Sequence, residues 1–141
     1  MSQKTAFVTG ASKGVGKGIA LGLAHAGWDV AINYYSDVSG AEETLKLIES
    51  TGQKGLTVGG NVGDKTDATA MFDTIKAEWG HLDCLVNNAG RQTWAPLLEL
   101  TEEDWDKTIT TNLKGSFLCT QLAAGLMKDQ PNGGSIINIG S

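Results

Sequence analysis

Short apolar segments with strand character alternate with amphipathic helical segments along the whole chain. Strands are predicted at residues 5–10, 29–34, 55–60, 84–87 and 135–139. These segments are almost continuously apolar, which is typical of strands buried on both faces of a parallel sheet. Because helices separate them and crossovers between parallel strands are right-handed, the pattern predicts an α/β fold with a doubly wound parallel sheet, as in Rossmann domains.

Local signals predict where the helices begin and end. The first helix is expected over residues 14–26, with Gly18 and Gly22 allowing it to lie close to the sheet. Ser39, with Glu42 three residues later, is predicted to cap the second helix. A single long helix is predicted to start at a Thr101 cap and fade near Lys128, with an apolar stripe formed by Trp105, Ile109, Leu113, Phe117 and Leu122.

Composition narrows the range of partners. The chain has 141 residues, which is one domain by length, and a formal net charge of −5. It has no basic block for nucleic acid or an anionic membrane, and no apolar run approaching the roughly 20 residues that span a bilayer. No signal-peptide segment precedes the first strand, and the two cysteines and two histidines show no metal-ligand spacing. We expect a cytoplasmic protein with free thiols and no metal.

The segment TGASKGVGKG, Thr9–Gly18, joins the first strand to the first helix. Glycines at 10, 14 and 16 allow a tight turn and bring bare backbone close to a diphosphate, which the helix N-terminus also attracts. The sequence Gly16-Lys17-Gly18 lacks the hydroxyl of a Walker loop, and the register does not match G-x-G-x-x-G. The spacing is T-G-x-x-x-G-x-G, and it predicts a dinucleotide-binding loop.

This loop and four other motifs resemble those of the short-chain dehydrogenase/reductases of ordinary length. The other motifs are NV at 61–62, NNAG at 87–90, TN at 111–112 and IGS at 139–141. The resemblance covers the chain from the first strand to the fifth. It implies an oxidoreductase that transfers a hydride between NAD(P)(H) and a small carbonyl or alcohol, within a homo-oligomer, commonly a tetramer. It points to sugar dehydrogenases or acyl-chain ketone reductases without separating them.

The resemblance also implies which residues hold the cofactor. Asn61 and Val62 would lie at the adenine, although many family members carry Asp at the first of these positions. Asn88, Ala89 and Gly90 would line the ribose and nicotinamide side. The full set of predicted cofactor-binding residues is Gly10, Ser12, Lys13, Gly14, Val15, Gly16, Tyr35, Ser36, Asn61, Val62, Asn88, Ala89 and Gly90.

The end of the second strand favours NADP(H), with NAD(H) as the alternative. An acidic residue there would bind the ribose 2′-hydroxyl and repel a 2′-phosphate, but this position is Tyr34. Lys13 can reach toward a 2′-phosphate, and Ser36 can add a hydrogen bond. Asp37 is near enough to reach the ribose, but we interpret it as a solvated residue of the turn that precedes the helix.

Two catalytic residues follow from the resemblance. Ser141 matches the serine that binds the substrate oxygen, and Asn112 matches the asparagine that helps hold a proton-relay water. Asn112 is expected to be buried among apolar neighbours on its helix. In the family, a Tyr-x-x-x-Lys motif follows that serine, and the sequence ends before it; its two tyrosines, Tyr34 and Tyr35, lie at the second strand.

The resemblance therefore predicts a dinucleotide-binding domain over residues 1–141 that is incomplete at its C-terminus. Its strands would be ordered 3-2-1-4-5, with the C-terminal strands missing and an apolar edge exposed at the fifth strand. Because the catalytic tyrosine and lysine are absent, a non-catalytic dinucleotide-binding module is the alternative function. A methyltransferase with a glycine-rich first loop fits less well, because it leaves NNAG and IGS unexplained.

Overall fold

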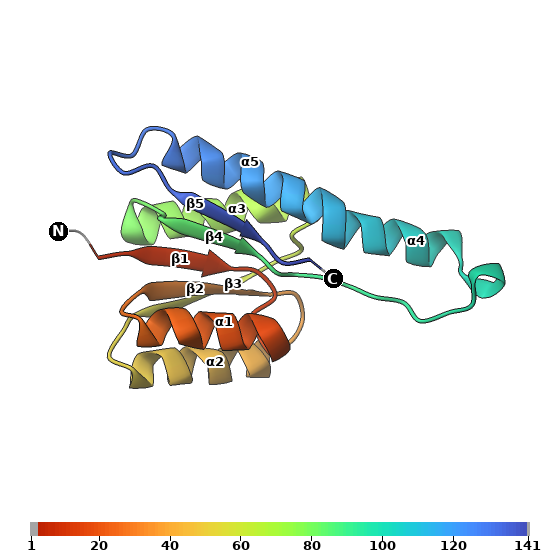
Figure 1. Ribbon diagram of the computed structural model, residues 1–141, viewed down its shortest axis with the longest axis horizontal. Coiled ribbons are helices and arrows are strands. Elements are labelled where there is room, and N and C mark those ends of the chain that lie inside the picture. The colour runs from red at the N-terminus through yellow and green to blue at the C-terminus, as the bar shows by residue number, and fades with distance from the viewer. Residues whose placement is uncertain (1–2, 141) are drawn as a thin grey trace.

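A computed structural model describes residues 3–140 and shows a five-stranded sheet between two layers of helices (Figure 1). The strands are β1 (Thr5–Val8), β2 (Asp29–Tyr34), β3 (Gly55–Gly59), β4 (Cys84–Asn87) and β5 (Ser135–Asn138). The helices are α1 (Gly14–His25), α2 (Val38–Ser50), α3 (Lys65–Trp79), α4 (Glu102–Ile109) and α5 (Gly115–Met127). A 3-10 turn, η1 (Leu97–Glu99), precedes α4, and a π turn, η2 (Thr110–Lys114), joins α4 to α5.

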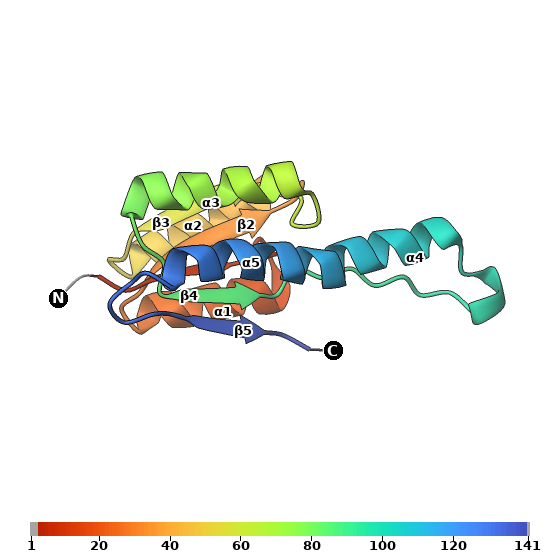
Figure 2. The same cartoon turned by 90° about the horizontal axis from the view of Figure 1, so that it is seen from above.

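All strand pairs are parallel, and their order is β3-β2-β1-β4-β5. Helices α1 and α2 cover one face of the sheet, and α3 and α5 cover the other (Figures 1 and 2). Each face has its own hydrophobic cluster. On the α3 side, for example, the rings of Phe7 and Phe72 meet edge to face at a centroid distance of 5.3 Å. Burial on both faces explains the continuously apolar strands β1, β2 and β4, whereas β5 at the edge of the sheet is largely exposed. The predicted fold class and strand order are confirmed.

Helix α2 begins earlier than the sequence predicted. Its N-cap is Asp37, whose carboxylate accepts a hydrogen bond from the Gly40 amide at 3.1 Å. Ser39 lies inside the helix, so the predicted Ser39 cap is wrong. Aspartate is a strong N-cap because its charge also interacts favourably with the positive end of the helix dipole. The predicted cap at Thr101 is confirmed, since its hydroxyl accepts from the Asp104 amide at 3.1 Å.

Two glycines of α1, Gly18 and Gly22, face solvent rather than the sheet. Gly18 and Gly22 are exposed, and a Cβ atom added to either would meet nothing within 4 Å. The small residues that are buried on this helix are Gly16, Ala20 and Ala24. The prediction that Gly18 and Gly22 permit close packing is therefore wrong, although small residues four apart do occupy the buried side of α1.

The predicted long helix is interrupted by the π turn η2. A π turn adds a residue to one helical turn and is frequent at functional sites. This turn packs against the connection between β3 and α3. A Cβ atom added at Gly63 would lie 2.5 Å from the carbonyl oxygen of Thr110, and one added at Gly115 would lie 2.6 Å from a methyl group of Val62. The chain therefore packs closely at both glycines, Gly63 against the backbone of Thr110 and Gly115 against the side chain of Val62.

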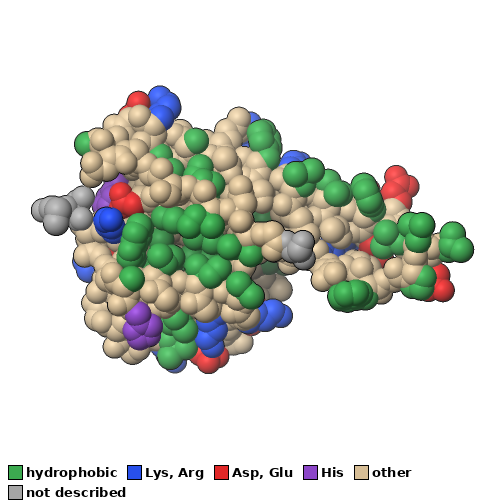
Figure 3. All heavy atoms as spheres, in the orientation of Figure 1, with side chains coloured by type: hydrophobic (Ala, Val, Ile, Leu, Met, Phe, Trp, Pro, Cys, Tyr) green, Lys and Arg blue, Asp and Glu red, His purple; other side chains and the backbone are tan. Residues whose placement is uncertain are grey.

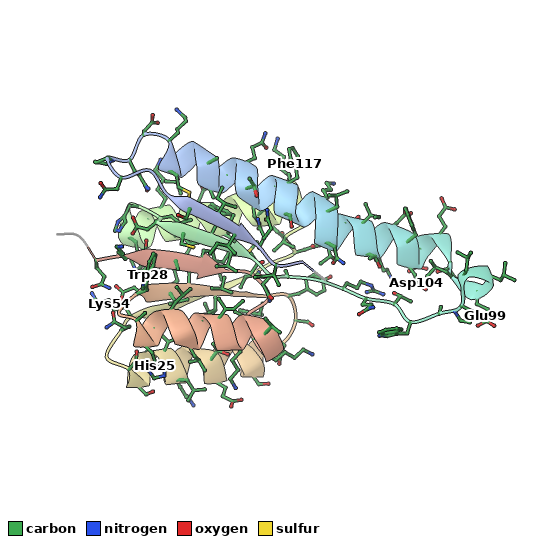
Figure 4. The ribbon with its side chains drawn as sticks, in the orientation of Figure 1. His25, Trp28, Lys54, Glu99, Asp104 and Phe117 are labelled. Atoms are coloured by element: carbon green, nitrogen blue, oxygen red, sulfur yellow. The ribbon has the colours of Figure 1, made fainter. Side chains whose placement is uncertain are left out.

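The predicted apolar stripe of this helix is largely exposed. Trp105, Leu113 and Phe117 are each more than half exposed, and Figure 4 shows Phe117 pointing away from the sheet. Helix α4 and turn η1 extend from the body of the molecule as an arm on which hydrophobic side chains gather (Figures 1–3). The buried residues of α5 are instead Gly115, Leu118, Cys119, Ala123 and Met127.

Both cysteines, Cys84 and Cys119, are buried free thiols. Burial raises the pKa of the Cys119 thiol to about 12 and also raises that of Cys84, where the neighbouring Asp83 charge adds to the effect. Within residues 3–140, no helix is long and apolar enough to cross a membrane. The same residues contain no cluster of His, Cys, Asp and Glu that could hold a metal ion.

The close approach at η2 can be tested by adding one methyl group. Gly63→Ala is expected to lower the free energy of unfolding by about 1–3 kcal/mol, because the new methyl group meets the backbone of Thr110. Gly22→Ala is the control: its methyl group enters open space on α1 and should raise the free energy of unfolding by about 0.5–1 kcal/mol. Urea denaturation measures both changes. If Gly63→Ala were as stable as the wild type, the β3–α3 connection would not press against the π turn.

Candidate dinucleotide-binding site

A cavity of about 950 Å³ opens at the carboxyl ends of β1, β2, β3 and β4. Adjacent strands β1 and β4 are where the strand order reverses, and ligands of doubly wound sheets bind at such switch points. All predicted cofactor-binding residues except Val15 and Gly16 line the cavity. The side chain of Val15 is exposed to solvent, while Gly16 is buried within the glycine loop.

The glycine loop has the backbone geometry of an anion-binding turn. Gly10 and Gly14 have φ angles of +62° and +60°, in the left-handed region that favours glycine. A Cβ atom added at Gly14 would meet nothing within 4 Å, so the backbone there is open to the cavity. Lys13 occupies the N-cap of α1 and makes no side-chain capping bond. The first amide groups of α1 are thus left without a side-chain acceptor, which favours a bound anion.

Residues after β4 hold the glycine loop in place through hydrogen bonds. The hydroxyl of Thr9 accepts hydrogen bonds from the Asn88 amide at 3.0 Å and the Ala89 amide at 2.9 Å. In return, the side-chain Nδ2 of Asn88 donates to the carbonyl oxygens of Thr9 and Gly10 at 3.1 and 3.2 Å. A Cβ atom on Gly16 would lie 2.3 Å from the Gly10 oxygen and 2.5 Å from this Nδ2. Gly16 therefore serves the loop through close packing rather than by lining the cavity.

Polar groups from the glycine loop and from the segment after β2 lie close together where β2 ends. Lys13, Tyr35, Ser36 and Asp37 all line this part of the cavity. The pKa of Asp37 is lowered, chiefly by its hydrogen bond to the Gly40 amide, then by the Ser12 hydroxyl, with the Lys13 charge contributing less. The carboxylate is therefore engaged as a helix cap, whereas Lys13 forms no ion pair within the described residues.

The turn after β3, predicted to bind adenine, is held by its own hydrogen bonds. The backbone amide of Asn61 donates to the carboxylate of Asp67 at 2.9 Å. Its side-chain oxygen accepts from the Gly63 amide, also at 2.9 Å, which uses one of the two lone pairs of that oxygen. Val62 is buried against Gly115. These contacts hold the turn in place as part of the cavity wall.

Asn112 lies in the π turn and clamps the segment that follows β4. The Arg91 amide donates to its side-chain oxygen at 2.7 Å, and its side-chain nitrogen donates to the Arg91 carbonyl at 2.8 Å. The residue is exposed, so the predicted burial is wrong, although both ends of its amide are paired. Asn112 does not line the cavity but fixes Arg91, which does. The other predicted catalytic residue, Ser141, lies outside the described residues.

Several lining residues were not predicted from the sequence. Asn33 and Gly60 lie between the glycine loop and the turn after β3, and Asn33 was signalled by its polarity within an apolar strand. Four more lining residues come from α4 and η2, and of these only Thr111 had a local signal, the TN motif. They are Asp106, Lys107, Thr110 and Thr111.

Known proteins share both this sequence and this fold. Residues 4–141 match the family model described as short chain dehydrogenase. The chain is 42% identical over 138 residues to 3-oxoacyl-(acyl-carrier-protein) reductase FabG of Staphylococcus aureus, covering 98% of this chain and 56% of that protein. The chain belongs to the short-chain dehydrogenase family.

Other family members are similar to the same extent. Glucose 1-dehydrogenase 2 of Bacillus subtilis is 39% identical over 142 residues, which cover 100% of this chain and 55% of that protein. Among solved structures, acetoin dehydrogenase from Enterobacter cloacae superposes with a TM-score of 0.91 at 39% identity, covering 99% of this chain and 56% of that one. This short-chain dehydrogenase sequence thus spans about half the length of the relatives it matches.

Proposed function

We propose that the protein is an NAD(P)(H)-dependent oxidoreductase that transfers a hydride between the nicotinamide and a small carbonyl or alcohol. The observation that carries this proposal is the glycine loop, where two left-handed glycines and the uncapped start of α1 open into the cavity. Bare amides in that arrangement suit a diphosphate. The reductase and dehydrogenase relatives support the redox class.

Each wall of the cavity would bind one part of the dinucleotide. The glycine loop would bind the diphosphate, Asn61 and Val62 the adenine, and Ala89 and Gly90 the nicotinamide side. The cofactor, when bound, supplies or accepts the hydride. Asn112 would act indirectly, by fixing the backbone of Arg91 beside the nicotinamide.

The remaining chemistry needs groups that bind the substrate oxygen and move its proton. We assign the first role to Ser141, by resemblance to the family serine. The general acid and its lysine partner would lie in the part of the relatives' length that this chain does not span. Two buried free thiols support a reducing compartment and thus the cytoplasm.

This assignment is tested by following absorbance at the nicotinamide band with the full-length protein. We expect oxidation of NADPH when small ketones such as acetoin, or 3-oxoacyl thioesters, are supplied. A protein that bound NADPH but did not oxidise it with any carbonyl substrate would instead be the non-catalytic dinucleotide-binding module. A protein that did not bind NADPH or NADH at all would contradict both functions.

For the cofactor, we propose a preference for NADP(H). Asp37 caps α2, and one of its carboxylate oxygens accepts from the Gly40 amide, so its charge is directed toward the helix N-terminus. Lys13 lines the same part of the cavity and has its ammonium group available for a 2′-phosphate. A charge-assisted contact of this kind is stronger than a neutral hydrogen bond.

Removing the Lys13 charge separates the two cofactors. Lys13→Ala is expected to weaken NADPH binding roughly tenfold, the loss of about 1.4 kcal/mol, and to leave NADH binding nearly unchanged. Lys17→Ala is the matched control, because Lys17 lies one turn further along α1 and pairs with Glu43 at 3.0 Å. Isothermal titration with both nucleotides measures the losses. Equal losses for NADPH and NADH in Lys13→Ala would contradict the assigned role.

We propose in addition that the protein is a homo-oligomer, a tetramer. The support is the exposed stripe of Trp105, Ile109, Leu113 and Phe117, whose members are four residues apart and follow one side of α4, η2 and α5. An apolar stripe of this length on a helix surface suits packing against the same stripe of a second copy, as in two-fold interfaces.

Placing a charge in the stripe is expected to separate the subunits. Phe117→Glu should reduce the mass measured by light scattering to that of a smaller assembly, because an unpaired carboxylate is costly at an apolar interface. Leu47→Glu is the control, since Leu47 is a partly exposed apolar residue on α2, away from the stripe. The proposal fails if Phe117→Glu keeps the wild-type mass, or if the wild type is already a monomer.

A further inference from the structure

Asn33 has a buried side-chain amide and is the second-to-last residue of the apolar strand β2. It is 2% exposed and reaches the two loops that form opposite walls of the cavity. Its side-chain oxygen accepts from the Gly10 amide at 3.0 Å. Its side-chain nitrogen donates to the carbonyl oxygens of Gly60 and Val58, at 3.0 and 3.3 Å. One amide group thereby joins the glycine loop to the end of β3.

The backbone of β2 strengthens this connection on both sides. The carbonyl oxygen of Asn33 accepts from the Ala11 amide at 2.9 Å, so two consecutive amides of the glycine loop are bound to one residue. On the other side, the Gly60 amide donates to the Tyr34 carbonyl at 2.9 Å. Gly60 is therefore held through both its amide and its carbonyl, directly before the adenine turn that begins at Asn61.

We propose that Asn33 is a positioning residue that sets the separation between the diphosphate-binding loop and the adenine-binding turn. The inference rests on the proposed dinucleotide function and adds to it a residue that does not itself need to touch the cofactor. A ligand that spans two loops binds tightly only when both are already at the correct separation, because otherwise it must order them on binding.

The chemistry of the position favours an amide over the alternatives. Gly10 presents a donor, whereas Gly60 and Val58 present acceptors, so the residue between them must accept on one side and donate on the other. A carboxylate would place its second oxygen against two carbonyl oxygens, and an apolar side chain would remove the partner of the Gly10 amide and of the Gly60 carbonyl. Such unpaired groups cost free energy when they are buried.

Ligands of different length test the inference. Asn33→Ala is expected to weaken the binding of NADPH, which spans both loops, by roughly 10- to 100-fold. Adenosine, which reaches only the adenine turn, should lose less than threefold. Isothermal titration measures NADPH binding, and NMR chemical shifts follow adenosine, each corrected for the folded fraction. Asn33→Asp should resemble Asn33→Ala, because it keeps the acceptor for Gly10 but loses the donor.

A loss of stability alone must be distinguished from a loss of positioning. Gln130 is the control: its side chain bonds to Leu82 and Gly133, at the other end of the sheet. Gln130→Ala should lower the melting temperature without changing NADPH affinity. Equal losses for NADPH and adenosine in Asn33→Ala, or unchanged NADPH affinity, would overturn the inference while the wild type still bound NADPH. Failure of the wild type to bind would identify the proposed function as the error.

The wild-type protein provides a measurement that requires no variant to fold. Without ligand, the Gly10 amide should exchange its hydrogen as slowly as the Ala11 amide, because each is bonded to Asn33. Exchange of the Gly10 amide at the rate of an open loop would show that the side chain of Asn33 does not hold it, and would also overturn the inference.

Discussion

The close packing of the glycine loop on the segment after β4 is the constraint on which the rest of the site depends. Added Cβ atoms at Gly10 and Gly16 would lie 2.8 Å and 2.3 Å from neighbouring backbone atoms, so neither position tolerates a side chain without displacement. The reciprocal bonds of Thr9 and Asn88 hold this arrangement. Because the loop is already closed by the protein's own groups, the amides at the start of α1 stay free for a ligand.

The fold was predictable because a few strong local signals agree with the global arrangement. Strands buried on both faces must be apolar throughout, and parallel strands need helical crossovers, so the pattern specifies the architecture. The N-cap of α2 was harder to predict, because Asp37 and Ser39 lie two residues apart and either side chain can cap a helix. The choice depends on tertiary structure: Gly40, the partner of Asp37, packs against Ser12, and its missing side chain leaves room for both.

The region from Thr101 to Lys128 shows what periodicity cannot reveal. Of the predicted stripe, four residues are exposed and Leu122 packs against the core, because an apolar pattern alone does not show what covers each residue. The exposed four are Trp105, Ile109, Leu113 and Phe117. Here the sheet takes a different set of α5 residues, and these four are left outside. The π turn had no signal for a related reason, because it accompanies the tight contact with Gly63 and so depends on residues far away in sequence. The motif TN identified Asn112 without predicting that its partner would be the backbone of Arg91.

The start of α2 also bears on which cofactor suits the cavity. If Ser39 were the cap, the carboxylate of Asp37 would be free to rotate toward a ribose and would oppose a 2′-phosphate. With Asp37 as the cap, the Gly40 amide and the Ser12 hydroxyl hold that charge and lower its pKa. The Lys13 charge then lies beside a carboxylate that is already partly satisfied. A helix that starts two residues earlier thus places the Asp37 charge at its own N-terminus, and this placement is the structural support for the proposed preference for NADP(H).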